Sequence, residues 1–169
     1  ESVAELYNIY ASYYMFIEEY EKACIEIKKA IEISEQIFGK DADLTLKFKC
    51  NKCLIEFNSG EFDKSNEQMT KLLNIVFDNP KKYVESMPLI LNSLLAISFE
   101  NKISSSMVLK MKRVLEIQSI KYDIASNIMF KCNLYCIMMF FGTNCDDPLI
   151  ENLQKELENY FKRYPYSEG

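Results

Sequence analysis

The residues that could do chemistry in this chain lack their usual partners. The sequence has six cysteines and no histidine. Without an imidazole, the commonest general base and the commonest metal ligand are both missing, and a cysteine–histidine nucleophile pair is excluded. The sequence also contains no Gly-x-Gly-x-x-Gly, Walker or Gly-x-Ser-x-Gly motif. We therefore expect a protein that is not an enzyme and has no cofactor.

One group of cysteines has a spacing that could bind zinc. Cys50-x2-Cys53 and Cys132-x3-Cys136 would supply four thiolates, enough for a tetrahedral site. Structural zinc thiolates usually lie on turns, however, whereas these four fall within apolar helical segments. We interpret them as small buried hydrophobic residues and expect no metal. Because disulfide scaffolds are short and rich in loops, the cysteines also indicate a reducing compartment, cytoplasmic or nuclear.

Charge and hydropathy argue against nucleic-acid and membrane partners. The net charge is −5, and the longest basic stretch comprises Lys110, Lys112 and Arg113 on one predicted helix, which we interpret as a solvated face. The most apolar run, Ile137 to Phe141, is far too short to span a bilayer. The acidic pairs Glu18-Glu19 and Asp146-Asp147 fall in predicted turns, where acids suit helix N-termini.

Helical spacing and helix-ending residues divide the chain into eight segments. Only 4 glycines and 4 prolines are present, which favours long helices over the many turns of an all-β fold. The predicted helices are residues 2–17, 19–38, 43–58, 62–77, 82–99, 106–117, 122–141 and 148–164. The length of 169 residues predicts a single domain over 1–169, and the absence of an initiator Met at Glu1 is interpreted as an internal fragment of a longer protein.

The first two helical pairs repeat with a period of 42 residues. Ala11 and Cys53 are separated by this distance, and so are Tyr20 and Phe62. Small residues match small residues and aromatic residues match aromatic ones; three further pairs at the same distance are Ala23 and Ser65, Ile27 and Met69, and Ile31 and Leu73. A sustained period of this length is typical of stacked helical hairpins, because one hairpin cannot bury both its faces.

These residues carry a resemblance to a known family. Tyr7-x2-Tyr10-Ala11-x2-Tyr14, followed by Tyr20-x2-Ala23-x3-Ile27-x2-Ala30, resembles the tetratricopeptide pattern, and the spacing is similar to the longer repeats of the kinesin light chain group. The resemblance covers residues 3–77 and fades beyond Pro80. Glu18 stands where the pattern prefers glycine. The resemblance implies an all-α, right-handed α-solenoid of about four antiparallel hairpins with roughly eight helices.

The resemblance also suggests where a partner would bind, because in this family the first helix of each hairpin faces the groove. The residues three before Ala11, Cys53, Leu95 and Cys136 include Asn8, Asn92 and Asn133. Such amides resemble those that hold a peptide backbone in kinesin light chain repeats, since an amide both donates and accepts. Four residues after each register point lie Met15, Phe57, Phe99 and Phe140, which would add an apolar strip. The alternative is that the asparagines are merely exposed and the phenylalanines belong to the core.

Three functions fit a helical repeat of this kind. The first, which we favour, is a scaffold that binds an extended peptide or a helix of another protein in its concave groove, without nucleic acid or membrane insertion; a homo-oligomer is also compatible. The second is the peptide-sensing domain of a receptor, and the third is a helical appendage of an enzyme. The sequence upstream of Glu1 would distinguish them.

Overall fold

The computed structural model describes an all-helical arrangement. The described residues are 2–79, 82, 83, 86, 89, 90, 93, 131, 132, 135, 136, 139 and 148–164, and none of them lies in a strand. They form α1 (Val3–Phe16), α2 (Tyr20–Phe38), α3 (Asp43–Asn58), α4 (Phe62–Asp78) and α8 (Pro148–Arg163). The chain divides into two compact units, Glu1–Asn101 and Lys102–Gly169, and each is described by itself.

The predicted helix bounds agree with these five helices to within one or two residues. The predicted helices over 82–99, 106–117 and 122–141 lie largely outside the described residues, so the total of eight helices stays a prediction. Within the last of these ranges, Lys131, Cys132, Tyr135, Cys136 and Met139 are helical.

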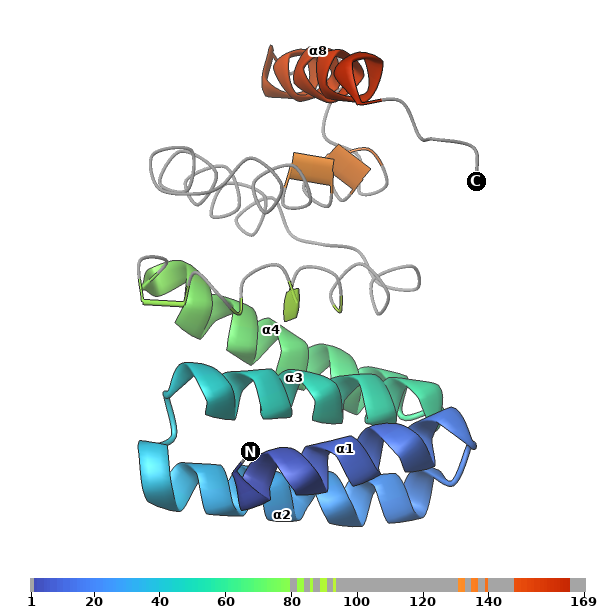
Figure 1. Cartoon of the computed structure of the whole chain (residues 1–169), viewed down its shortest axis with the longest axis vertical. Coiled ribbons are helices and arrows are strands. Elements are labelled where there is room, and N and C mark those ends of the chain that lie inside the picture. Colours follow the sequence, from blue (N-terminus) through green and yellow to red (C-terminus); the bar gives the residue numbers. More distant parts are fainter. Residues whose placement is uncertain are drawn as a thin grey trace. The chain divides into compact units, whose positions relative to one another are not determined.

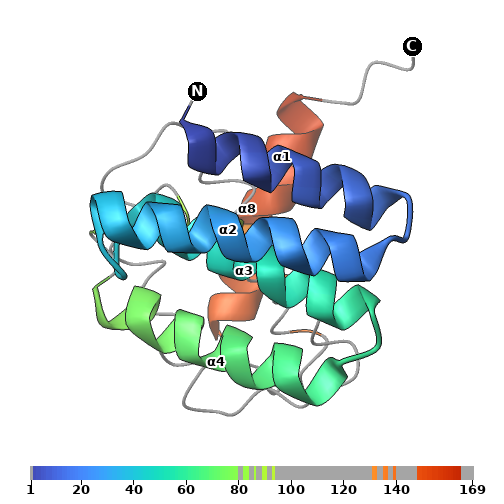
Figure 2. The ribbon, with the colours of Figure 1, turned by 90° about the horizontal axis from the view of Figure 1, so that it is seen from below.

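In the first unit, the four helices form two stacked antiparallel hairpins (Figure 1). Helix α1 packs on α2, and α3 packs on α4, while α3 also contacts both helices of the first hairpin. Seen from below, the four helices lie side by side in the order of the sequence (Figure 2). Helix α1 begins at a capping box, in which the Ser2 hydroxyl accepts from the Glu5 amide and the Glu5 carboxylate accepts from the Ser2 amide.

The backbone repeats with the same period as the sequence. The amide of Glu19 donates to the carbonyl of Tyr14 at 2.8 Å, and 42 residues later Glu61 donates to Glu56 at 2.9 Å. Three further turn and cap hydrogen bonds recur at this distance, so the two hairpins turn in the same way. The 42-residue period is therefore a structural repeat.

Small residues lie where the two helices of each hairpin meet. Ala11 and Ala23 are at most 1% exposed, as are Cys53 and Ser65 in the second hairpin. The Ser65 hydroxyl donates to the Cys53 carbonyl at 2.7 Å, which shows how closely α3 and α4 approach. Ala30 is fully buried as well. The predicted packing role of these small residues is confirmed.

The second hairpin is attached to the first through apolar and polar contacts. Phe48 and Ile55 of α3 belong to one buried cluster with residues of the first hairpin, which are Ala4, Ala11, Ala23, Ile27 and Ala30. At one edge, the hydroxyls of Ser34 and Thr45 are 2.7 Å apart, and Thr45 also donates to the Gly39 carbonyl. A large apolar side chain on the first helix of one hairpin thus enters the small-residue groove of the hairpin before it.

Candidate interaction surfaces

The predicted groove residue Asn8 is part of a contact between the first helices of the two hairpins. Its side-chain oxygen accepts from the Asn51 amide at 2.8 Å, across 43 residues of sequence. Seven residues further on, the Asn58 amide lies 3.8 Å from the sulfur of Met15, again 43 residues apart. Asn8 and Met15 therefore lie on the same side of the unit, along the line where α1 meets α3.

Phe57, a residue of the predicted apolar strip, contacts the second helix of its own hairpin. Its ring packs edge to face on Phe62 at the start of α4, with centroids 5.1 Å apart, and it is half-buried. The contact connects the end of α3 to the beginning of its partner helix. The other predicted site residues, Asn92, Asn133, Phe99 and Phe140, lie outside the described residues.

Cys50 occupies the repeat position that holds asparagine in Asn8, and it is fully buried. Burial raises the pKa of its thiol to about 11, with a smaller opposing effect from a hydrogen bond to Ser93. Burial also raises the pKa of Cys53 above its ordinary value. Both thiols are therefore protonated at neutral pH and behave as small core residues. Among the described residues, no group of three or more His, Cys, Asp or Glu side chains could hold a metal ion.

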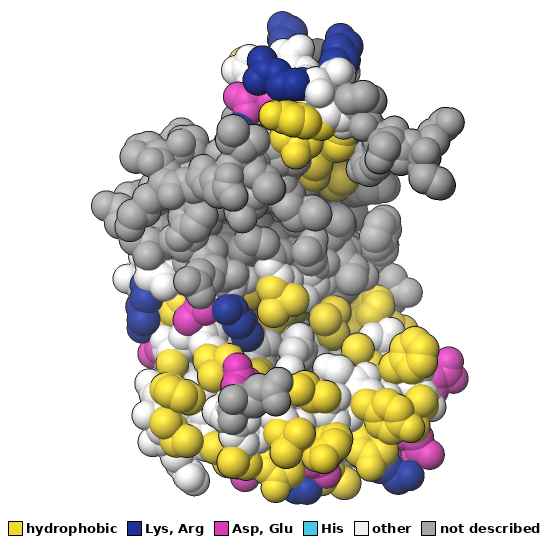
Figure 3. Space-filling view, in the orientation of Figure 1, with side chains coloured by type: hydrophobic (Ala, Val, Ile, Leu, Met, Phe, Trp, Pro, Cys, Tyr) yellow, Lys and Arg dark blue, Asp and Glu magenta, His cyan; other side chains and the backbone are white. Residues whose placement is uncertain are grey.

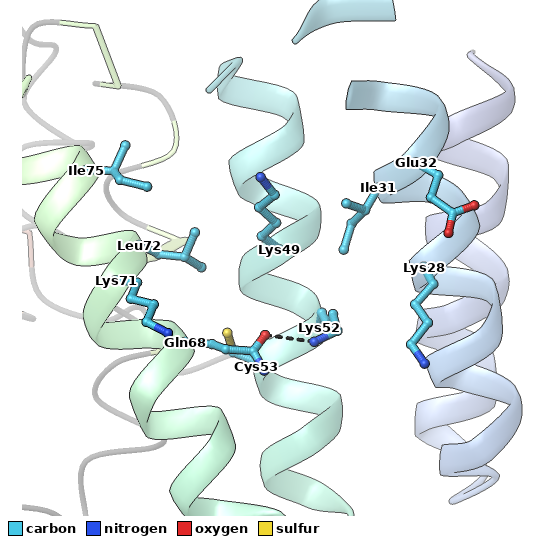
Figure 4. A pocket seen from close by; sticks show the side chains of 10 residues that line it. All are labelled: Lys28, Ile31, Glu32, Lys49, Lys52, Cys53, Gln68, Lys71, Leu72 and Ile75. Atoms are coloured by element: carbon cyan, nitrogen blue, oxygen red, sulfur yellow. Dashed lines mark hydrogen bonds between the residues drawn. The ribbon is translucent and has the colours of Figure 1, made fainter. Parts of the chain in front are cut away.

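A second surface, which the sequence did not indicate, is a cavity on the other side of α3. It has a volume of about 380 Å³ and lies over α3 between α2 and α4 (Figure 4). Its floor is apolar, whereas its rim carries four lysines and one glutamate; the lining residues are Lys28, Ile31, Glu32, Lys49, Lys52, Cys53, Gln68, Lys71, Leu72 and Ile75. In a chain with a net charge of −5, this is a locally basic site.

The rim lysines differ in how far neighbouring acids neutralise them. Lys52 is the most constrained, because its ammonium group lies 2.6 Å from the Glu56 carboxylate and 2.7 Å from the Gln68 amide oxygen. Lys49 pairs with Glu35 at 2.8 Å, outside the cavity lining. Lys28 forms no ion pair with a residue that the structure describes. A negatively charged ligand would thus meet lysines whose charge is only partly neutralised by neighbouring carboxylates.

The two surfaces lie on opposite faces of α3. With 3.6 residues per turn, Lys49 and Cys53 share one face of the helix, whereas Asn51 and Asn58 project roughly half a turn away from them. The cavity is therefore separate from the asparagine contacts. Sequence reasoning missed it because its lysines come from three helices, and each lysine alone resembles an ordinary solvated residue.

Comparisons with known proteins agree with this fold. No protein-family model matches the chain, and no curated protein does so either. Among solved structures, it is similar to BtubC (BKLC) from P. vanneervenii, with a TM-score of 0.67 and 16% identity over 99% of this chain. This chain spans 66% of that structure's length. A Podosopora anserina kinesin light chain structure with nearly identical TPR-like repeats gives a TM-score of 0.42 and 11% identity, covering 99% of this chain and 100% of that one.

The first of these similarities, together with the internal repeat, defines the class of fold. The chain has a tetratricopeptide-like helical-repeat fold. None of the described helices is long and apolar enough to cross a membrane.

Proposed function

We propose that this chain is a non-enzymatic interaction module that binds an extended peptide or a helix of a partner protein. The fold supports this proposal, because stacked hairpins create long grooves without requiring catalytic groups. The observation that carries it is the cavity between α2, α3 and α4, which combines an apolar floor with a lysine rim. Ligand sites in proteins have this mix of apolar lining and a few polar groups.

The chemistry of the cavity favours one kind of partner segment. Ile31, Leu72 and Ile75 would receive one bulky apolar side chain, and the volume of about 380 Å³ is large enough for it. Lys28 and Lys71 lie on the two helices that flank the cavity, where they would pair with acidic residues on either side of that side chain (Figure 4). The proposed ligand is therefore an acidic segment with a central Leu, Ile, Met or Phe.

The line of asparagines on the opposite face of α3 is a second candidate surface on the same scaffold. The side chains of Asn8 and Asn51 form one hydrogen bond with each other. Their remaining donors and acceptors could pair with a peptide backbone. Asn92, Asn133, Phe99 and Phe140, the other residues that the sequence predicts for the groove, lie outside the described residues. The asparagine surface suits an extended chain of any sequence, whereas the cavity selects for charge.

A displayed peptide library distinguishes the two surfaces. We expect the selected peptides to be enriched in Asp or Glu flanking an apolar residue. The double variant Lys28→Glu with Lys71→Glu should bind a selected peptide at least about tenfold more weakly than the unmodified chain. The unmodified chain should itself bind the peptide more weakly at high salt. The matched control is Lys22→Glu with Lys155→Glu, which changes the net charge equally at exposed lysines outside the cavity.

Two outcomes would contradict the cavity as the site. One is a selection without acidic enrichment, and the other is equal affinity for the cavity variant and the control variant. If binding instead falls in the double variant Asn92→Ala with Asn133→Ala, the groove of first helices is the site. Each lost amide contact should then weaken binding by roughly 0.5–1.5 kcal/mol.

A further inference from the structure

Lys52 differs from the other lysines of the cavity between α2, α3 and α4 in how deeply its ion pair is buried. The side chains of Lys52 and Glu56 are 17% and 3% exposed, whereas those of Lys71 and Glu67 are both 67% exposed. Water screens the exposed pair, so a ligand carboxylate can replace Glu67 there at little cost. Separating the buried pair would leave the Glu56 carboxylate inside the protein with too few partners, which is far less favourable. An acidic ligand can therefore recruit Lys71 much more easily than Lys52.

The Glu56 carboxylate has no partner to spare. Its Oε1 atom lies 2.6 Å from the ammonium group of Lys52 and 3.1 Å from that of Lys64. Its Oε2 atom is buried and accepts no hydrogen bond from the part of the chain that the structure describes. Lys64 is itself shared, because the Glu61 carboxylate lies 2.8 Å from it. Together these two lysines and two glutamates carry no net charge, so Lys52 adds no net positive charge to the cavity.

Gln68 restrains the Lys52 ammonium group from the other side. Its amide oxygen accepts from Lys52 at 2.7 Å, and Figure 4 shows this side chain extending from α4 toward Lys52 on α3. An ammonium group has three donors, and the Glu56 and Gln68 contacts use two of them. Lys52 is thus held within the protein by a carboxylate of its own helix and an amide of the next one.

The floor of the cavity beside this lysine is apolar. Leu72 is 5% exposed, and Ile31 and Ile75 are half-buried. Apolar side chains also cover much of the first unit in the space-filling view (Figure 3). An apolar floor alone would therefore not distinguish the cavity from the surface around it. The selectivity of the cavity must come from which of its lysines are available to a ligand.

We infer that Glu56 and Gln68 are positioning residues that set the specificity of the cavity, an inference that rests on its proposed function as a site for an acidic peptide. Because they hold Lys52, its ammonium group does not pair with the central side chain of the ligand. The centre then accepts an apolar residue and rejects an acidic one, while acidic residues of the ligand pair with Lys28 and Lys71 on either side. Without the charge of Glu56, Lys52 would be released and the centre would accept Asp or Glu.

The test compares two synthetic peptides that differ only at the central residue. Both carry glutamates on either side of the centre; one has Leu at the centre and the other has Glu. We expect the unmodified chain to bind the Leu peptide at least about tenfold more tightly, because the apolar floor offers a buried carboxylate no partner. Glu56→Gln should reduce this ratio to about threefold or less, or reverse it, because an uncompensated lysine then attracts the central Glu. Isothermal titration calorimetry measures the dissociation constants.

The matched control is Glu35→Gln, which removes the same charge beside another lysine of the cavity. Glu35 pairs with Lys49 at 2.8 Å, and the two side chains are 28% and 26% exposed. This variant should strengthen the binding of both peptides by similar factors and leave their ratio nearly unchanged. A merely structural role of Glu56 would likewise change both affinities together, so the ratio reports on specificity alone. If Glu56→Gln does not fold, Gln68→Ala takes its place and should lower the ratio in the same direction.

Three results would overturn the inference. If the Leu peptide binds but Glu56→Gln, or Gln68→Ala in its place, keeps the ratio of the unmodified chain, this inference fails and the proposed function stands. An unmodified chain that prefers the central Glu would show that Lys52 already engages the ligand, which also overturns the inference alone. If neither peptide binds the unmodified chain, the proposed function of the cavity fails together with the inference.

Discussion

Glu18 and Gly60 occupy the same turn position of the two hairpins and share a left-handed backbone, with φ of +62° and +89°. They are 42 residues apart. The amide of each donates to a carbonyl three residues earlier, in Glu18 to Met15 and in Gly60 to Phe57. The turn thus requires a conformation that glycine adopts freely, and the first hairpin forms it with a residue that does not.

Exchanging these residue types should change stability in opposite directions. We expect Glu18→Gly to raise the free energy of unfolding by about 0.5–1 kcal/mol, because relief of left-handed strain exceeds the entropy that glycine gains in the unfolded chain. Gly60→Ala should lower it by about 1 kcal/mol. No neighbouring atom lies within 4 Å of a Cβ at Gly60, so backbone strain alone would be measured. Urea unfolding provides both values; a loss of stability in Glu18→Gly would contradict the turn assignment.

Overpacking one small position should destabilise the first hairpin. Ala23 is fully buried where α2 meets α1, so Ala23→Leu should cost roughly 1–3 kcal/mol of unfolding free energy. The control is Ile25→Leu two residues away, where the side chain is 53% exposed and the change should be small. Equal denaturant midpoints for the parent chain and Ala23→Leu would show that the small position tolerates a large side chain.

Much of this fold could be predicted because its signals are local or strictly periodic. The local sequence indicates where a helix ends, as at Gly39, or begins, as at Pro148. Small residues at repeated positions, such as Ala11 and Cys53, indicate where helices pack closely. The contacts between neighbouring hairpins were harder to predict from the sequence. The register predicted equivalence at 42 residues, but stacked first helices touch at 43, as Asn8 and Asn51 do. The lysine cavity was missed because its residues come together only through packing of three helices.

The buried thiols should make stability depend on alkaline pH. The pKa of Cys50 is raised to about 11 in the folded chain from an ordinary value of 9.0, so the unfolded chain loses this proton first. The resulting stabilisation is complete below pH 9 and is lost as the pH rises toward 11. The loss should be on the order of 2–3 kcal/mol, at about 1.4 kcal/mol per pH unit. Urea unfolding at pH 8 and pH 10.5 should show a steeper decline for the parent chain than for Cys50→Ala.

The cysteines should not hold zinc. Burial raises the pKa values of Cys50, Cys53 and Cys132, which opposes formation of the thiolates that zinc binds. We expect a chain purified with added zinc to contain much less than one metal ion per molecule, and a chelator to leave its melting temperature unchanged. A metal analysis close to one zinc per chain would contradict our interpretation of these residues.

The amide pair between α1 and α3 should contribute to the stacking of the two hairpins. Asn51 donates to Asn8 at 2.8 Å, and both side chains are half-buried, so the hydrogen bond is shielded in part from water. A double-mutant cycle of Asn8→Ala and Asn51→Ala should give a coupling of about 0.5–1.5 kcal/mol in the free energy of unfolding. The control cycle pairs Asn8→Ala with Asn66→Ala on α4, where additive effects are expected. Additive effects in both cycles would show that the Asn8 side chain does not stabilise the stacking of the two hairpins. Coupling of Asn8 to Asn51 alone would mean that Asn8→Ala weakens ligand binding in part because it weakens the stacking of α1 on α3.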